Sequence, residues 1–315
     1  MAVSIEIEQP EGQRLLHNLE RVILGKTEEL SLVLVALLAE GHLLLEDVPG
    51  VGKTTLARAL ARSLQLDFRR VQFTPDLMPS DILGSAILLP GEGRFEFAPG
   101  PIFTSVLLAD EVNRASPRTQ SALLEAMSEG QVTIDGISRA LPAPFFVVAT
   151  QNPVDYQGTY PLPEAQLDRF LLRLELGYPA PEQELELLYA QQQEHPLATL
   201  QPVIDGETLR RLQREVRQVR VARPVAEYLL RLVARTRGHA ELALGGSPRA
   251  ALALFQASRA RAFLGGRDYL LPDDVQGLAR PVLAHRLVLR PQARYAGRTA
   301  RQVVDQILDE EEVPT

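Results

Sequence analysis

The fold is decided by the stretch Pro49-Gly50-Val51-Gly52-Lys53-Thr54-Thr55, a glycine-rich turn that ends in a lysine and two threonines. Lysine occurs only twice in the 315 residues, whereas arginine occurs 31 times. A phosphate-binding loop explains the lysine, because a slim ammonium reaches phosphate oxygens that a planar guanidinium meets poorly. The backbone N–H groups of such a loop wrap the phosphates, and the Thr54 hydroxyl is expected to bind Mg²⁺. We therefore predict a nucleotide site at residues 49–55.

The residues on either side of this turn fit the strand–loop–helix context that a phosphate loop requires. A short apolar strand is expected at 42–46, and helical spacing follows at 54–64. The start of that helix adds free N–H groups and the positive end of its dipole. One residue departs from the usual pattern, because Asp47 stands where glycine is common and its carboxylate must point away from phosphates. An ordinary Gly-Pro turn is the alternative for this segment alone.

Two further strands end in polar residues. The apolar run at 106–109 is followed by Asp110 and Glu111, and the run at 145–150 is followed by Asn152. Asp110 is expected to hold Mg²⁺ through water, and Glu111 to orient and deprotonate an attacking water. Asn152 is placed to hydrogen-bond the γ-phosphate or that water. The alternatives are a solvated acidic turn and an everyday Asn-Pro turn.

The hydrophobic pattern predicts an α/β domain followed by an all-helical one. Strands are also expected at 70–73 and 170–176, with helices between most strands, and this alternation indicates a parallel sheet covered on both faces. Beyond residue 181 no convincing strand is expected, and helices are predicted at 182–193, 206–220, 224–236, 248–264, 272–285 and 298–309. A Gly-Pro-rich stretch at 177–181 marks the junction, so we predict domains at 1–178 and 179–315.

Composition excludes several classes of protein. The chain contains no cysteine, so neither a disulfide framework nor a cysteine metal site is possible. Its formal net charge of −7 disfavours nucleic acid as the partner. No signal peptide is expected at the N-terminus, and the longest apolar run, at 30–38, is too short to span a bilayer. We therefore expect a cytoplasmic protein without a membrane segment.

These segments together resemble the AAA+ ATPases and, within them, the MoxR family. The resemblance covers nearly the whole chain and rests on six ordered motifs: EDVPGVGKT (46–54), GPIF (100–103), ADEVNRA (109–115), QSALLEAM (120–127), ATQNP (149–153) and LPEAQLDRF (162–170). It implies an αβα nucleotide-binding core with a helical lid, and ATP and Mg²⁺ as ligands. It also indicates that Asp47 is tolerated in the phosphate loop.

The resemblance implies roles for single residues. Asn152 is the expected sensor 1, Arg169 the arginine finger that reaches a neighbouring subunit's site, and Arg249 the sensor 2 on the lid. Arg249 is expected to act with Lys53 and Mg²⁺ in one subunit, with Arg169 supplied by the next. The simpler interpretations are a surface arginine at 249 and, at 169, a salt bridge with Asp168 or Glu164. Further candidates are a base pocket at Val22, Ile23 and Gly25, beside Lys26, and subunit-facing roles for Arg114 and Arg118.

An inserted hairpin is expected at 85–103. Phe95 and Phe97 fall on one face of its second strand, either exposed for contact with a client or packed on the core. An Asp-Gly turn predicts another hairpin at 132–138. A stripe of arginines at helical spacing is more consistent with a solvated face than with a nucleic-acid surface; it comprises Arg210, Arg214 and Arg217.

The function that we expect is ATP hydrolysis by a ring, by family resemblance a hexamer, that remodels or matures a protein client. The family often acts with a partner that carries a von Willebrand factor A domain. One alternative is a nucleic-acid motor of the MCM-related group, which shares the inserted hairpin. Another is the ATPase subunit of a magnesium-chelatase-like complex, and a third is a nucleotide switch without turnover. The adjacent carboxylates Asp110 and Glu111 argue against a switch.

Overall fold

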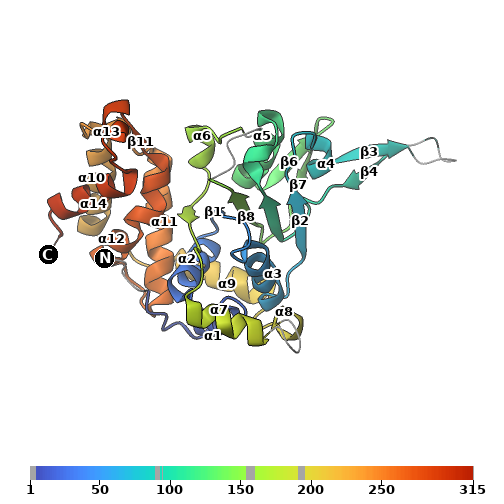
Figure 1. The fold of residues 1–315 in the computed structure, drawn as a ribbon, viewed down its shortest axis with the longest axis horizontal. Coiled ribbons are helices and arrows are strands. Elements are labelled where there is room, and N and C mark those ends of the chain that lie inside the picture. The colour runs from blue at the N-terminus through green and yellow to red at the C-terminus, as the bar shows by residue number, and fades with distance from the viewer. Residues whose placement is uncertain (1–4, 89–92, 94, 154–159, 191–195, 315) are drawn as a thin grey trace.

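A parallel sheet forms the centre of the molecule (Figure 1). The computed structural model describes residues 5–88, 93, 95–153, 160–190 and 196–314. Within them the main sheet has the strand order β2-β5-β8-β1-β9, and its strands are β1 (Leu43–Glu46), β2 (Phe68–Gln72), β5 (Val106–Asp110), β8 (Phe146–Gln151) and β9 (Leu172–Leu174). All neighbouring pairs in this sheet are parallel. The expected α/β core is confirmed.

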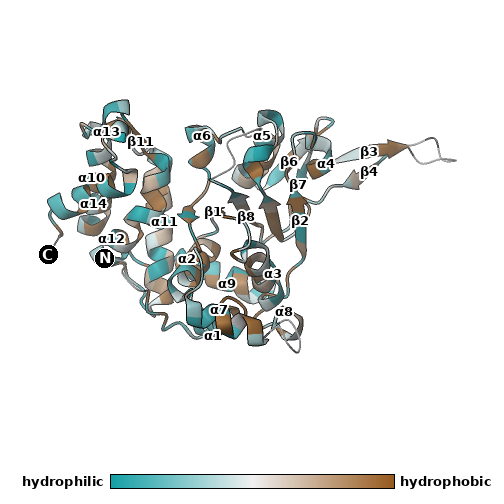
Figure 2. Ribbon diagram, viewed as in Figure 1, coloured by the Kyte–Doolittle hydropathy of each residue, from teal (hydrophilic) through white to brown (hydrophobic). Residues whose placement is uncertain are grey.

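Helices bury both faces of this sheet. Successive strand residues point to opposite faces, so Phe146 and Val148 pack with α1 (Pro10–Glu20), α2 (Thr27–Leu38) and α3 (Lys53–Ser63). Val147 and Ala149 instead pack with α5 (Pro117–Glu129). This two-sided burial explains why the central strands are uninterrupted apolar runs, which appear brown in Figure 2.

The parallel register gives the sheet two chemically different edges. The strands end at a carboxyl edge, where Glu46 lies beside Gln151 and Gln72 beside Asp110. They begin at an amino edge, where the Leu171 N–H donates to the His42 carbonyl oxygen at 2.8 Å. The C-terminal turn of α5 also reaches the amino edge, since His42 Nε2 lies 2.9 Å from the carbonyl oxygen of Met127.

The C-terminal part is a helical lid beside the sheet (Figure 1). Its helix α11 (Pro248–Leu264) packs against α12 (Pro272–Leu283), α10 (Arg223–Gly238) and α2. Further helices are α13 (Pro291–Tyr295) and α14 (Ala300–Glu310), and a 3-10 turn, η2, spans Ala284–Arg286. The expectation of no strand beyond residue 181 is wrong, because β10 (Leu242–Leu244) pairs with β11 (Val288–Leu289). These strands are too short to show an alternating pattern.

The segment between core and lid lies against the core. Its elements are α7 (Pro181–Ala190), α8 (Pro196–Thr199) and α9 (Gly206–Val216), whereas the short helix α6 (Glu164–Leu167) precedes β9 within the core. Gln213 of α9 donates to the Leu37 carbonyl oxygen at 2.9 Å, and the Val203 N–H donates to that of Ser63 at 2.9 Å. The proposed division at 178/179 stays a prediction. No helix among the described residues is long and apolar enough to cross a membrane.

Two antiparallel hairpins extend from the core. The inserted one pairs β3 (Gly84–Leu88), which follows α4 (Pro79–Leu83), with β4 (Phe95–Pro99), and it projects from the molecule (Figure 1). A turn is predicted from the sequence at Pro90-Gly91-Glu92-Gly93, and its first three residues lie outside the described residues. The second hairpin, β6 (Gln131–Ile134) and β7 (Ile137–Ala140), also forms.

The two hairpin phenylalanines have different environments. The Phe95 side chain is exposed, at 72% of its accessible surface. The Phe97 ring packs edge-on to Phe103 at 5.6 Å between centroids, and the Arg139 guanidinium lies 3.9 Å from its centroid. Phe95 therefore fits the expectation of an exposed ring, whereas Phe97 is half-buried against Phe103 and the second hairpin.

Candidate nucleotide site

The glycine-rich loop follows β1 directly and leads into α3. Gly50 and Gly52 have φ angles of 88° and 94°, a left-handed backbone that favours glycine. Helix α3 begins at Lys53, so its first N–H groups point into the loop. The Lys53 ammonium donates to the carbonyl oxygens of Asp47 at 2.5 Å and Val48 at 3.1 Å. Burial lowers the pKa of Lys53, although nearby carboxylates oppose this effect.

The unusual residue Asp47 has a structural role in this arrangement. Its side chain is buried, and both of its oxygens accept backbone N–H groups, from Val48 at 2.9 Å and from Gly177 at 2.6 Å. The carboxylate thus ties the start of the loop to the segment that follows β9. Because both carboxylate oxygens accept these N–H groups, the Asp47 carboxylate points away from the phosphate-binding side of the loop, as the sequence requires.

The two adjacent carboxylates lie at the same edge, each held by an arginine. Asp110 accepts from Arg70 at 2.6 Å and from the Thr150 hydroxyl at 2.5 Å. Glu111 accepts from Arg114 at 2.8 Å, and its φ of 57° places it in left-handed backbone. Such a conformation at a non-glycine residue carries strain that is often found at functional sites.

Strand β2 contributes two partners that sequence reasoning missed. Arg70 binds Asp110, and Gln72 donates to a Glu111 oxygen at 2.7 Å. Their spacing of two places them on one side of the strand, and this was the only signal available. Arg114, which was a candidate for a neighbouring subunit, instead pairs with Glu111 of its own chain. Arg118 is exposed at the start of α5.

The other predicted binding residues lie around this loop. Ile23 Cδ1 would lie 3.6 Å from a Cβ built on Gly52. Gly25 has a φ of 67°, and the Gln183 side chain packs so closely that a Cβ would lie 1.8 Å from its Nε2. Lys26 donates to the Tyr178 carbonyl oxygen at 3.0 Å. Ile23 therefore lies beside the phosphate loop, whereas Gly25 and Lys26 contact the segment that follows β9.

Asn152 and the metal donors complete the carboxyl edge. Asn152 is half-buried just after β8, and its carbonyl oxygen lies 3.5 Å from Asn113 Nδ2. Thr54 is half-buried in the first turn of α3. A threonine hydroxyl and the Asp110 carboxylate are hard oxygen ligands of the kind that Mg²⁺ takes in nucleotide sites, so the donor set fits this ion.

Arg169 lies at the opposite edge of the sheet. Its guanidinium donates to the Leu124 carbonyl oxygen at 2.6 Å and to the Ser128 hydroxyl at 2.5 Å, both in the second half of α5. The alternative of a salt bridge with Asp168 is not observed in the described structure, because Asp168 pairs with Arg286 of the lid at 2.9 Å. Arg169 and Lys53 are thus separated by the length of the strands.

Arg249 also lies at the amino edge. It is exposed in the first turn of α11, two residues after the N-cap Ser247. The Ser247 hydroxyl donates to Asp168 at 2.8 Å, which places this end of α11 beside Arg169. The structure therefore groups the predicted site residues in two places, with the two cationic residues apart from the phosphate loop.

Two sequence families match separate parts of the chain. Residues 42–172 match the ATPase family associated with various cellular activities (AAA). Residues 234–307 match the AAA lid domain. The first match spans the phosphate loop, Asp110, Glu111, Asn152 and Arg169, and the second contains Arg249.

Relatives are similar over most of the chain. Uncharacterized protein YeaC of Bacillus subtilis is 53% identical, covering 94% of this chain and 93% of the relative. Chaperone MoxR1 of Mycobacterium tuberculosis is 41% identical, covering 96% and 82%. Protein MoxR of Methylorubrum extorquens is 33% identical, covering 92% and 90%. The crystal structure of a candidate ATPase from Cytophaga hutchinsonii superposes with a TM-score of 0.91 at 37% identity, covering 98% and 96%.

Proposed function

We propose that this chain, which belongs to the MoxR family of AAA+ ATPases, hydrolyses ATP at sites shared between adjacent subunits of a ring. The observation that carries the proposal is the separation of charges along the sheet. Lys53, Asp110 and Glu111 lie at the carboxyl edge, whereas Arg169 and Arg249 lie at the amino edge. A complete site then needs two copies of the chain, and a heterologous contact that closes on itself forms a ring.

The position of Arg249 supports a role different from the one expected from the sequence. Ser247 places the start of α11 beside Asp168, the neighbour of Arg169. We therefore assign Arg249 to the next subunit's ATP, together with Arg169, rather than to its own subunit's phosphates. Two cations arriving from one neighbour would stabilise the charge that develops during phosphoryl transfer.

The carboxyl-edge residues bind the nucleotide and activate water. Lys53 and the loop N–H groups bind the β- and γ-phosphates, and the Val22 to Lys26 segment contacts the base. Glu111 takes the proton of the attacking water, and Asn152 helps to orient that water. Thr54 and Asp110 would hold Mg²⁺, which when bound neutralises phosphate charge. Before this chemistry Glu111 must leave Gln72 and Arg114, which bind it at 2.7 and 2.8 Å.

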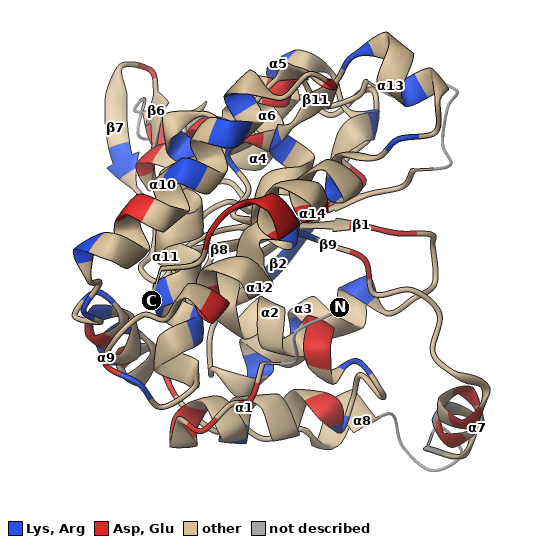
Figure 3. Cartoon of the chain, turned by 90° about the vertical axis from the view of Figure 1, so that its left-hand side faces the viewer, with Lys and Arg blue, Asp and Glu red and all other residues tan. Residues whose placement is uncertain are grey.

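The work done by hydrolysis is proposed to be the remodelling of a protein client in the cytoplasm. A relative named chaperone MoxR1 and the exposed Phe95 on the inserted hairpin support this proposal. We also propose a hexamer and a partner with a von Willebrand factor A domain, both on family resemblance alone. Nucleic acid is disfavoured, because Arg217 pairs with Glu40 and Arg210 binds the Ala143 carbonyl oxygen. On the face drawn in Figure 3, blue and red residues are interspersed.

Mixing inactive variants tests the shared site. A Lys53→Ala subunit cannot bind ATP but still presents Arg169 to its neighbour. An Arg169→Ala subunit binds ATP but presents no arginine finger. Mixed rings contain interfaces that combine an intact ATP pocket with an intact Arg169, so they should recover part of the phosphate release. No recovery in mixtures shown to co-assemble would refute the shared site.

A second mixture tests the assignment of Arg249. If Arg249 acts on the neighbour's ATP, a mixture of Arg169→Ala with Arg249→Ala stays inactive, because each interface lacks one cation. If Arg249 serves its own subunit, some mixed interfaces are complete. In these, the Arg169→Ala subunit binds ATP with its own Arg249, and the Arg249→Ala subunit supplies Arg169. Recovery in this mixture would therefore contradict the assignment.

A further inference from the structure

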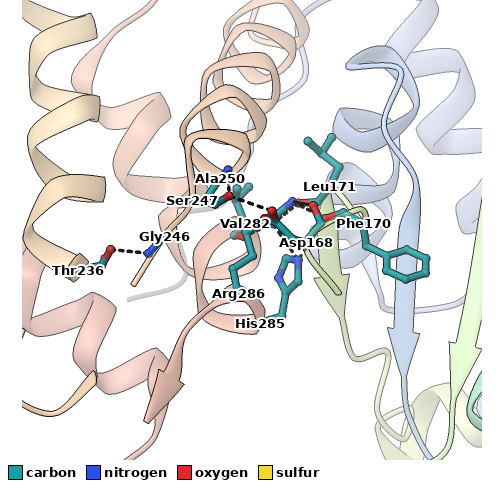
Figure 4. A network of polar contacts seen from close by, with 10 residues as sticks. All are labelled: Asp168, Phe170, Leu171, Thr236, Gly246, Ser247, Ala250, Val282, His285 and Arg286. Atoms are coloured by element: carbon teal, nitrogen blue, oxygen red, sulfur yellow. Dashed lines mark hydrogen bonds and ion pairs between the residues drawn. The ribbon is translucent and has the colours of Figure 1, made fainter. Parts of the chain in front are cut away.

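The lid and the amino edge are joined by a polar junction that consists of Asp168, Ser247, His285 and Arg286 (Figure 4). One carboxylate is at its centre. The Asp168 oxygens accept the Ser247 hydroxyl at 2.8 Å and the Arg286 Nε at 2.9 Å. Asp168 belongs to the core, whereas its partners belong to two different segments of the lid, so a single side chain connects three parts of the chain.

Arg286 holds the backbone that follows the arginine finger. It is only 4% exposed, and it donates to the carbonyl oxygens of Phe170 at 2.5 Å and Leu171 at 3.2 Å. It also binds the Val282 carbonyl oxygen within the lid. Burial lowers the pKa of Arg286 to about 10, with Asp168 opposing this shift, so the guanidinium is charged at neutral pH.

His285 fills the remaining side of the junction. Its Nε2 lies 3.1 Å from the Phe170 carbonyl oxygen and 2.8 Å from an Arg286 nitrogen. Complete burial and the neighbouring Arg286 charge hold the pKa of His285 well below its ordinary value. The imidazole is therefore neutral, and Arg286 is the cation that balances Asp168.

Ser247 connects the same carboxylate to the helix that carries Arg249. Ser247 is the N-cap of α11 and accepts the Ala250 N–H at 3.1 Å. The preceding Gly246 is tied to α10, because its N–H donates to the Thr236 hydroxyl at 2.8 Å. The backbone that leads into Arg249 is therefore held to α10 through Gly246 and to Asp168 through Ser247.

We propose that Asp168, Ser247 and Arg286 are positioning residues that hold Arg169 and Arg249 in one rigid frame, so that both cations reach the neighbouring subunit's phosphates together. The proposal rests on the proposed function, since it assumes that both arginines act on the next subunit. Its physical basis is that Asp168 directly precedes Arg169 in sequence and binds the cap of the helix that carries Arg249. Preorganised charges stabilise a transition state without reorganising during the reaction.

The proposal predicts an asymmetric effect of weakening the junction. A subunit with a loosened junction should bind and position its own ATP normally, because its carboxyl edge is unchanged. The neighbour that receives its misplaced arginines should turn over more slowly. A purely structural junction would instead weaken assembly or folding, irrespective of which subunit carries the change.

The test places Ser247→Ala in either member of the complementing mixture. In the finger donor, Lys53→Ala with Ser247→Ala, we expect the recovered turnover to fall by roughly tenfold to a hundredfold, as misplaced catalytic groups do. In the pocket donor, Arg169→Ala with Ser247→Ala, recovery should match that of the parent mixture. An equal effect in the two arrangements, or none in either, overturns the proposal. Failure of the parent mixture itself overturns the shared site.

Three variants separate positioning from stability. Ser247→Thr keeps the hydroxyl and should retain recovery in the finger donor. Thr299→Ala removes another lid N-cap, that of α14, and should leave recovery unchanged. Arg286→Lys keeps a charge without the forked guanidinium and should reproduce the asymmetry of Ser247→Ala. Loss of recovery with the Thr299→Ala control would show that any weakening of the lid suffices, and would contradict the proposal.

Discussion

The two edges of the central sheet hold their ion pairs in different ways. At the carboxyl edge the arginines that bind Asp110 and Glu111 are each 43% exposed. At the amino edge the Arg286 side chain is 2% exposed. A half-exposed arginine regains water when it leaves a carboxylate, whereas the buried Arg286 would become an unpaired charge. The difference indicates that the carboxyl edge can rearrange around a nucleotide, while the amino edge acts as a fixed frame.

The largest effect is expected from Lys53→Ala. This change removes the ammonium at the centre of the carboxyl edge, so tight ATP binding should be lost while the lid and the amino edge stay folded. Titration with a fluorescent ATP analogue and a thermal melt measure the two outcomes. Unchanged affinity would show that the phosphates bind elsewhere.

Glu111→Gln should separate binding from chemistry at the same edge. The amide cannot accept the water's proton, so ATP should bind while turnover falls by roughly 10²- to 10⁴-fold. Single-turnover phosphate release measures this rate. A variant that hydrolyses ATP at the full rate would exclude Glu111 as the base.

Matched arginine variants compare the two edges directly. Arg286→Met removes a buried guanidinium from Asp168 and from the carbonyl oxygens of Phe170 and Leu171, and should lower the free energy of unfolding by about 3–5 kcal/mol. Arg70→Met removes a half-exposed guanidinium from the buried Asp110, which keeps the Thr150 hydroxyl as a donor, and should cost less, about 1–2 kcal/mol. Urea denaturation of the two variants provides the comparison. Equal losses in the free energy of unfolding for the two variants would contradict a fixed amino edge and an exchangeable carboxyl edge.

The amino edge should also make stability depend on pH. His42 Nδ1 accepts the Val147 N–H at 3.1 Å, and complete burial lowers the His42 pKa to about 4 from 6.5. As the pH falls, His42 is protonated in the unfolded state before it is protonated in the folded state. Its full contribution to the free energy of unfolding is therefore present above pH 6.5 and is lost as the pH drops toward 4. The loss reaches about 3 kcal/mol.

Urea midpoints between pH 7 and pH 4.5 measure this dependence. His42→Gln supplies a neutral donor and acceptor, so its midpoints should fall less steeply over the same range. His285, which is also buried and has a lowered pKa, contributes to the slope that remains. Equal slopes for the variant and the parent would mean that His42 does not titrate in this way.

The smallest effect is expected in the hairpin, where the same contrast between exposed and packed groups recurs. Phe97→Ser removes the ring that packs on Phe103 and Arg139, and should cost about 2 kcal/mol. Phe95→Ser changes an exposed ring and should leave the melting temperature unaltered while weakening client coupling. Equal melting temperatures for the two variants would contradict the different packing of the rings.

Much of the carboxyl edge could be predicted from the sequence because its residues follow local patterns. Lys53 lies in a glycine-rich turn, and Asp110 and Glu111 directly follow an apolar strand, so a strand-by-strand interpretation brings them together. The pairing of β10 with β11 could not be predicted, since strands of three and two residues show no periodicity. The partners Arg70 and Gln72 were missed because only the register of β2 with β5 places them beside the carboxylates.

The sequence by itself determined the sheet, the phosphate loop and the chemical types of the residues at the site. Only the tertiary structure decided that Asp168 meets Ser247 and Arg286, which are 79 and 118 positions away in the chain. The physical reason is that a strand or a loop is encoded by neighbouring residues, whereas a buried ion pair depends on how separate elements pack. Arg249 looks like one surface arginine among many until the lid's position shows which edge of the sheet it serves.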